Sequence, residues 1–138
     1  MRVYLVAPQR VIDLWPVVGP ILQRATDRSR GRYLLRDLLE KLEAGDMQLW
    51  VVGDANEQIV GAMTTTVITY PRCRALAAIY VAGRDGVEWG DVALAALDSV
   101  ARGTGCTKIE FIGRPGWKRW GESHGFKHTF STFEKTVT

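Results

Sequence analysis

The stretch that decides the fold reads Cys106-Thr-Lys-Ile-Glu-Phe-Ile-Gly-Arg-Pro-Gly-Trp-Lys-Arg-Trp-Gly-Glu-Ser-His-Gly-Phe126. Its first part alternates charged and apolar side chains, as a strand with one buried face does. The Gly-Arg-Pro-Gly sequence then predicts a tight turn. Trp117 and Trp120 follow three residues apart, so they share one face of a short helix. The stretch therefore predicts a strand, a turn, a short helix and a Gly-Phe exit.

Toward the N-terminus, hydrophobic periodicity predicts alternating groups of helices and strands. The most regular amphipathic helix begins near Trp89 and ends near Val100. Pro16 and Pro20 interrupt an earlier helical pattern, and we expect them to bend that helix. The remaining predicted elements are strands at 2–6, 47–53, 58–70, 74–82 and 107–112, helices at 11–25 and 35–42, and a closing strand or hairpin at 126–137.

This order predicts one α+β domain spanning residues 1–138. A strand, a helix and a neighbouring strand form a βαβ crossover, and it is attached to an antiparallel meander. The 46% apolar and 24% charged fractions are those of an ordinary globular protein. The apolar runs are too short to span a bilayer, and the N-terminus reads as a strand, so we expect a cytoplasmic protein without membrane contact.

Several kinds of site are disfavoured by the composition. Cys73 and Cys106 belong to no Cys-x-x-Cys pair, and His124 and His128 have no ligand-like neighbours, so no metal site is expected. Arginines cluster between Arg24 and Arg36, which fits either a solvated surface or a grip on phosphates. The net charge of +3 is small and no aromatic stacking pattern accompanies the arginines, so nucleic acid is the weakest partner hypothesis.

The element order and the Gly125-Phe126 exit resemble the GNAT superfamily of N-acyltransferases, whose last helix ends in a Tyr-x-x-x-Gly-Phe-like motif. The resemblance covers nearly the whole chain through its architecture. It implies a mostly antiparallel twisted sheet that splays between strands four and five and is flanked by about four helices. Leu14-Trp-Pro16, Leu49-Trp-Val51, Thr64-Thr-Thr66, Tyr70-Pro71 and Gly113-Arg-Pro-Gly-Trp117 further resemble small GNAT-like proteins of tailed phages and prophages.

The resemblance also implies where acetyl-CoA or another acyl-CoA would bind. In the family the donor lies where the fourth and fifth strands separate, and a glycine-rich loop before a helix holds its pyrophosphate. The family spacing Arg-x-x-Gly-x-Gly is not reproduced here, and the same glycines also suit a plain strand-to-helix turn. The candidate cofactor-binding residues are Ile79, Val81, Gly83, Arg84, Gly86 and Gly90.

The catalytic residues of the family do not carry over. Four residues before Gly125, where the family places its tyrosine, this chain has Gly121, and Arg114-Pro-Gly stands where many members have an asparagine. Tyr80, Glu110 and His124 are the candidate replacements. Each has a plainer interpretation: Glu110 suits an outward charged face, and His124 a helix cap.

Two functions follow from these patterns. The first is an acyl-CoA-dependent N-acyltransferase of unknown acceptor, with the arginine loop near that acceptor. The second is a catalytically inactive GNAT-fold protein that has a structural or interaction role with phage proteins, in the cytoplasm or the virion. An open gap between the fourth and fifth strands favours the first. A gap plugged by Trp117, Trp120 or Tyr80 favours the second.

Overall fold

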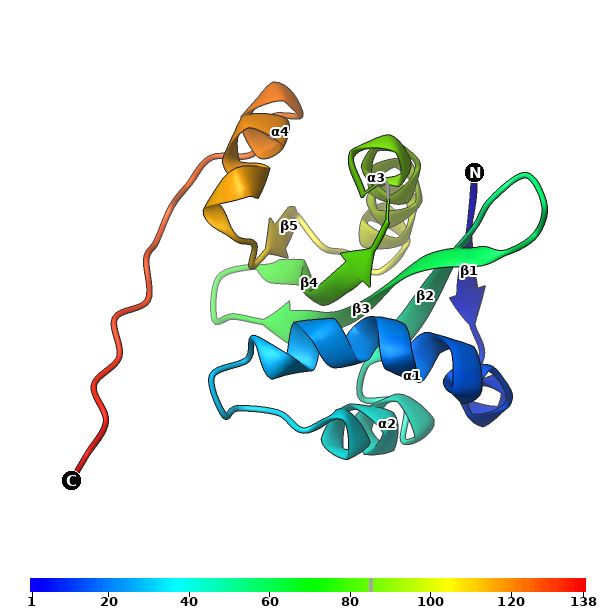
Figure 1. Ribbon diagram of the computed structural model, residues 1–138. Helices are drawn as coiled ribbons and strands as arrows, with labels where there is room; N and C mark the ends of the chain where they lie inside the picture. The colour runs from blue at the N-terminus through cyan, green and yellow to red at the C-terminus, as the bar shows by residue number, and fades with distance from the viewer. Residues whose placement is uncertain (85) are drawn as a thin grey trace.

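A mixed sheet forms the centre of the protein (Figure 1). The computed structural model describes residues 1–84 and 86–138, without the side chains of 86–88. Neighbouring strands are antiparallel from β1 to β4, and β5 joins β4 in parallel. The strands lie in chain order: β1 (Arg2–Val6), β2 (Gln48–Gly53), β3 (Ile59–Thr69), β4 (Arg74–Gly83) and β5 (Lys108–Phe111). The predicted α+β class and GNAT-like arrangement are confirmed.

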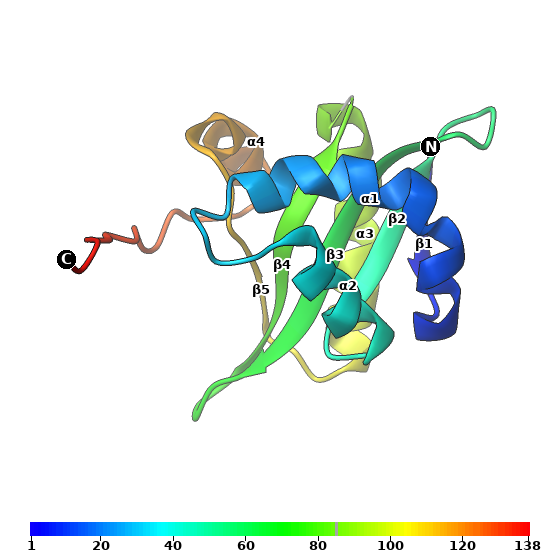
Figure 2. The ribbon, with the colours of Figure 1, turned by 60° about the horizontal axis from the view of Figure 1, so that its bottom comes forward.

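Helices cover both faces of this sheet. α1 (Val11–Asp27), which follows the short turn η1 (Pro8–Arg10), and α2 (Leu35–Glu43) lie on one face, and α3 (Gly86–Gly103) lies on the other (Figure 2). A turn, η2 (Pro115–Trp117), leads into the short α4 (Lys118–Ser123) beside β5. Within the described residues, no helix is long and apolar enough to cross a membrane.

The two faces have separate hydrophobic cores. On the α1–α2 face, Leu22 and Leu38 pack with Leu49 and Tyr80. On the α3 face, Trp89 packs with its neighbours, which include Val52, Leu76, Ala93 and Leu97. Because β4 contributes to both cores, its side chains are fixed from both sides. This strand is therefore a rigid support for a site at its edge.

The first helix runs through both of its prolines without being split. An interior proline removes one backbone hydrogen bond, so the carbonyls of Ile12 and Pro16 lose their donors. Ile12, Pro16 and Pro20 are all exposed, and water can hydrate those carbonyls. The helix therefore tolerates prolines on its outer face.

Two expectations about element boundaries were wrong. α3 begins at Gly86, about a turn before the expected start, so Gly86 and Gly90 belong to a helix and not to a loop. Residues 126–138 form no strand, and after Phe126 the segment continues as an exposed, extended chain (Figure 1). Phe130 and Phe133 in this segment are 90% and 93% exposed. A segment becomes a strand only where a partner edge accepts its hydrogen bonds, and among the described residues this one is paired with no strand.

Candidate functional site

The site is built where β4 and β5 separate. The parallel ladder pairs Ala75–Ala78 with Lys108–Phe111, and the amide of Ile112 still donates to the Ala78 carbonyl at 3.3 Å. β4 then continues to Gly83, whereas the segment after β5 turns away from β4 into η2. A gap therefore opens beside Ile79–Gly83, as the splayed sheet predicts.

A β-bulge in β4 lies at the start of this gap. Met63 pairs with Val81 and Thr65 with Ala78, so two residues of β4, Ile79 and Tyr80, face the single Thr64 of β3. Thr64 is fully buried, and its Oγ1 accepts the Tyr80 amide at 3.3 Å. Bulges re-aim side chains near functional sites. A polar Thr64 in a buried strand was a sequence signal for this irregularity.

The backbone of β4 beyond the bulge offers hydrogen-bonding groups to the gap. The Arg84 amide donates to the Val60 carbonyl of β3 at 3.0 Å. In an antiparallel pair, successive residues direct their backbone groups alternately toward and away from the partner. The amides and carbonyls of Val81 and Gly83 therefore face away from β3, into the gap.

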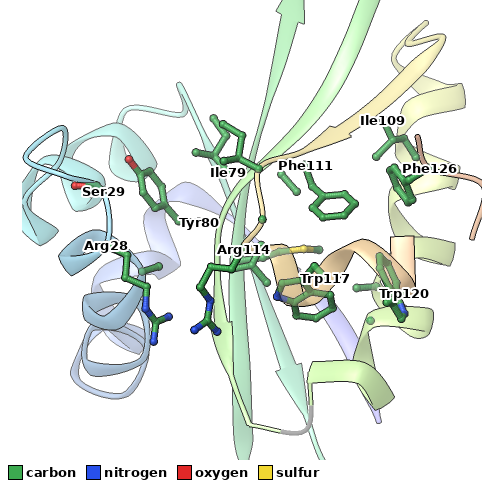
Figure 3. Close-up of a pocket in the computed structure, with 18 of the residues that line it drawn as sticks. Arg28, Ser29, Ile79, Tyr80, Ile109, Phe111, Arg114, Trp117, Trp120 and Phe126 are labelled. Atoms are coloured by element: carbon green, nitrogen blue, oxygen red, sulfur yellow. The ribbon is translucent and has the colours of Figure 1, made fainter. Parts of the chain in front are cut away.

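A cavity of about 430 Å³ occupies this region (Figure 3). Its walls are mainly apolar and aromatic, and arginines of the α1–α2 connection lie on one side. β4 contributes Ala78–Val81 and α3 contributes Trp89, Gly90, Ala93, Leu94 and Leu97. The walls after β4 include Ile109, Phe111, Trp117, Trp120 and Phe126. The volume is in the usual range for small-molecule sites, roughly 300–1,000 Å³.

The candidate cofactor residues divide between the cavity and its surroundings. Ile79, Val81 and Gly90 line the cavity, whereas Gly83 and Arg84 are not among its described lining residues. Gly83 has φ +149°, and a Cβ there would lie 2.6 Å from the Gly61 Cα, so close backbone packing requires glycine. Gly86 starts α3, and Asp85 and the side chain of Glu88 are outside the described part of the chain.

Arg84 holds the connection between β4 and α3. Its carbonyl accepts the Trp89 indole N–H at 2.8 Å, and its guanidinium lies 3.5 Å from the Asp54 carboxylate. The main chain and side chain of Arg84 are therefore both engaged within the protein. This arrangement fixes the entry into α3.

Of the three catalytic candidates, only Tyr80 lines the cavity. It is 8% exposed, and its ring lies 5.1 Å from the ring of Tyr33. Burial raises the pKa of Tyr80 above its ordinary value, the neighbouring Tyr33 adds to the rise, and Arg32 opposes it. The hydroxyl is therefore protonated at neutral pH. In Figure 3 it points toward the side of Ser29 in the α1–α2 connection.

Glu110 and His124 lie away from this cavity's described lining. Glu110 accepts a hydrogen bond from the Tyr70 hydroxyl at 3.1 Å, and this bond raises the pKa of Tyr70. The His124 Nε2 lies 2.9 Å from the Asp91 carboxylate, and its ring stacks on Trp120 at 4.5 Å. Both side chains therefore make contacts within the protein.

Asp91 joins α4 to the first turns of α3, and no pattern in the sequence indicated this role. Its carboxylate accepts the Trp120 indole N–H at 3.0 Å and contacts His124. The Trp120 ring lies against Gly90, where an added Cβ would be 3.1 Å from the indole. Trp117 meets Trp120 edge-on at 5.4 Å. The tryptophans therefore pack within the protein as walls of the cavity, and they leave its volume open.

The position of the expected tyrosine is tightly packed. Gly121 is buried in α4, and an added Cβ would lie 3.2 Å from the Phe111 ring and 3.5 Å from the Phe126 Cβ. Phe111 and Phe126 themselves pack edge-on at 4.8 Å. The aromatic cluster therefore takes the space that a larger side chain at 121 would need. Among the described residues no cluster with metal-ligand composition is found.

No family model and no curated protein sequence matches the chain, but solved structures share its fold. A probable acetyltransferase has a TM-score of 0.74 at 12% identity, covering 100% of this chain and 99% of that one. A ribosomal-protein-alanine N-acetyltransferase from Brucella melitensis biovar Abortus 2308 has a TM-score of 0.71 at 11% identity, covering 99% and 100%.

A third similar structure is an aminoglycoside acetyltransferase from an uncultured soil metagenomic sample, in complex with sisomicin. Its TM-score is 0.71 at 12% identity, and the match covers 99% of this chain and 96% of that one. Likenesses at these identities define a fold. The chain has the GNAT-like fold of these acetyltransferases over its whole length.

Proposed function

We propose that this protein is an N-acyltransferase that takes its acyl group from acyl-CoA bound in the gap between β4 and β5. The observation that carries the proposal is the open cavity of about 430 Å³ at the point where β5 leaves β4. Structures with this fold include acetyltransferases named for ribosomal-protein alanine and for aminoglycosides. Their named acceptors differ, so the fold alone does not select an acceptor for this chain.

The residues of the gap suit the pantetheine arm of the donor. Its amides can pair with the free backbone groups of Val81 and Gly83, as an added strand pairs with a sheet edge. Phe111 and Trp117 give the arm apolar walls. α3 begins at Gly86, and the unpaired amides of a helix start are suited to a pyrophosphate.

The bound thioester supplies an acyl carbon to an amine: the nitrogen–carbon bond forms, the carbon–sulfur bond breaks, and one proton passes from nitrogen to sulfur. Gly121 has no proton to offer this transfer. Tyr80 is the candidate that lies in the cavity, and its raised pKa keeps its hydroxyl able to donate a hydrogen bond. Because the Tyr80 hydroxyl points toward the α1–α2 connection, we propose that it contacts the acyl acceptor.

A competing proposal is supported by Gly121. A GNAT-fold protein without acyl transfer, which binds another phage or prophage protein, has no need of the family tyrosine, and Gly121 stands at that position in tight packing with Phe111. This proposal expects no acyl-CoA binding and a stable protein complex. The open cavity favours the enzyme, because the aromatic residues line the gap and do not fill it.

Calorimetric titration with acetyl-CoA tests the proposal. The wild-type protein should bind it saturably at roughly micromolar to millimolar concentration. Val81→Trp places a large ring in the cavity and should weaken binding at least about tenfold. Val92→Trp is the matched control, because Val92 is exposed on α3 outside the described cavity lining. Absence of wild-type binding at millimolar acetyl-CoA would overturn the proposal.

A further inference from the structure

The cavity has an excess of positive charge along one side. Its lining includes Arg28, Arg30 and Arg32 from the α1–α2 connection and Arg114 from the turn after β5. We call these four residues the arginine rim. The acidic residue among the described lining is Glu134. A guanidinium stays charged at all physiological pH values, so four cations face one carboxylate.

Glu134 shows how part of the rim holds a carboxylate. It comes from the extended C-terminal segment, and its two oxygens contact Arg30 Nε and, at 2.8 Å, Arg32. Hydrogen bonds from Arg30 and then Arg32 hold the pKa of Glu134 below its ordinary value. Planar guanidinium groups are suited to carboxylates in this two-pronged way. The rim therefore already binds one carboxylate, which the chain itself supplies.

The other half of the rim has no carboxylate within ion-pair distance in the described residues. Arg28 and Arg114 come from opposite sides of the cavity, and their guanidinium groups point to the same part of it (Figure 3). Cations that line one cavity raise the local concentration of anions there. A ligand with a negative group can supply such an anion.

The connection that carries three of these arginines is held in a defined shape. Arg30 has φ 58° and Gly31 φ 79°, so two consecutive residues are left-handed. The Ser29 hydroxyl accepts the Tyr33 amide at 3.0 Å and donates to the Tyr33 carbonyl at 3.1 Å. A non-glycine residue in this region is strained, and such strain persists only where the surrounding structure holds it in place. The arginines are thus pre-positioned toward the cavity.

We propose that the arginine rim binds a carboxylate carried by the acyl acceptor, and that Glu134 fills part of this subsite in the free protein. The acceptor class is an amine that also bears a carboxylate, as amino acids and acidic peptides do. This inference rests on the proposed function, in which the donor lies on the α3 side of the gap. The rim lies mainly on the α1–α2 side, where Tyr80 also points, and the acceptor enters from there.

Glutarate is the probe for this subsite, because its two carboxylates can engage both halves of the rim. Calorimetry with the full chain should show saturable glutarate binding. Arg28→Gln together with Arg114→Gln should weaken it about tenfold, since charge-assisted contacts are lost. Glu134→Gln should tighten glutarate binding about threefold or more, because the Glu134 carboxylate no longer competes for Arg30 and Arg32.

Two matched variants act as controls. Arg36→Gln removes an exposed arginine of α2, and Glu43→Gln removes an exposed carboxylate at the end of α2; neither residue is among the described lining of the cavity. Both should leave glutarate binding unchanged. Equal weakening by Arg36→Gln would show a general effect of charge and would overturn the assignment.

Other outcomes are equally decisive. Absence of saturable glutarate binding to both wild type and Glu134→Gln would overturn the inference. Inorganic phosphate binding as tightly as glutarate would overturn the carboxylate class. A parallel titration with acetyl-CoA separates the two proposals: donor binding without glutarate binding contradicts only the arginine rim, and glutarate binding without donor binding contradicts only the acyltransferase.

Discussion

Single residues on β4 set both the shape and the chemistry of the gap. Gly83 allows β4 to lie directly against β3 just before the strand ends, and Tyr80 lies on the bulge that begins the gap. Gly83 has a geometric role, and Tyr80 has a chemical one. Each can be tested by one substitution.

Gly83→Ala should destabilise the protein by about 2 kcal/mol or more, because the new Cβ meets backbone atoms and the residue must keep an unfavourable φ. Denaturant unfolding monitored by circular dichroism measures this loss. Gly116→Ala is the control, since a Cβ there meets nothing within 4 Å. Equal stability of the two variants would show that the close approach of β4 to β3 is not maintained in solution.

The raised pKa of Tyr80 predicts a dependence of stability on alkaline pH. The buried phenol ionises at higher pH in the folded than in the unfolded chain, whose ordinary value is 10.0. Its contribution is therefore complete below pH 10.0 and is lost as pH rises through the folded pKa. Wild type should lose stability relative to Tyr80→Phe above that pH. A constant difference between the two across this range would contradict the burial of Tyr80.

At the scale of elements, α4 is attached to α3 by a small polar clamp. Asp91 accepts the Trp120 indole N–H and contacts His124, and Gly90 makes room for the indole. The clamp closes one side of the cavity. It is built from Asp91 of α3, Trp120 of α4 and His124, which directly follows α4.

Asp91→Ala should therefore lower the free energy of unfolding by about 1 kcal/mol, since the indole and imidazole lose a shared acceptor. Asp98→Ala on the same helix has no ion-pair or side-chain hydrogen-bond partner among the described residues and should cost less than about 0.5 kcal/mol. Urea unfolding of the two variants gives the comparison. A larger loss in Asp98→Ala would contradict the clamp.

The C-terminal segment makes a different prediction. Residues 127–138 are exposed and contribute no strand, so a chain ending at Phe126 should keep its stability within about 1 kcal/mol. Phe126 itself must stay, because it packs on Phe111. Thermal unfolding of the shortened chain measures the effect. A severe loss would indicate that the segment pairs as a strand in solution.

Local patterns predicted the elements well but not their contacts. The helix at 89–100 was visible because its apolar residues repeat at helical spacing. Its earlier start at Gly86 was hidden, because glycines before a helix also suit a loop. The segment after Phe126 was expected to be a strand or hairpin, yet strand pairing depends on a distant edge that no local pattern reveals. Asp91 gave no signal because its partners come from another helix.

At the scale of the whole molecule, the parallel attachment of β5 to an otherwise antiparallel sheet creates the site. β4 serves both cores, so its edge stays in place where β5 departs. Three arginines reach the cavity from the α1–α2 connection, and Arg114 and the aromatic walls come from the segment after β5. The fold was predictable from element order, whereas the cavity depended on which side chains the two faces bring together.

A crystal structure of the protein with coenzyme A would test the central claim most directly. The account predicts the pantetheine arm between β4 and β5, with its amides hydrogen-bonded to the backbone of Val81 and Gly83 and its thiol near the bulge at Tyr80. Coenzyme A bound at another surface, or a gap that stays empty at saturating ligand, would contradict it.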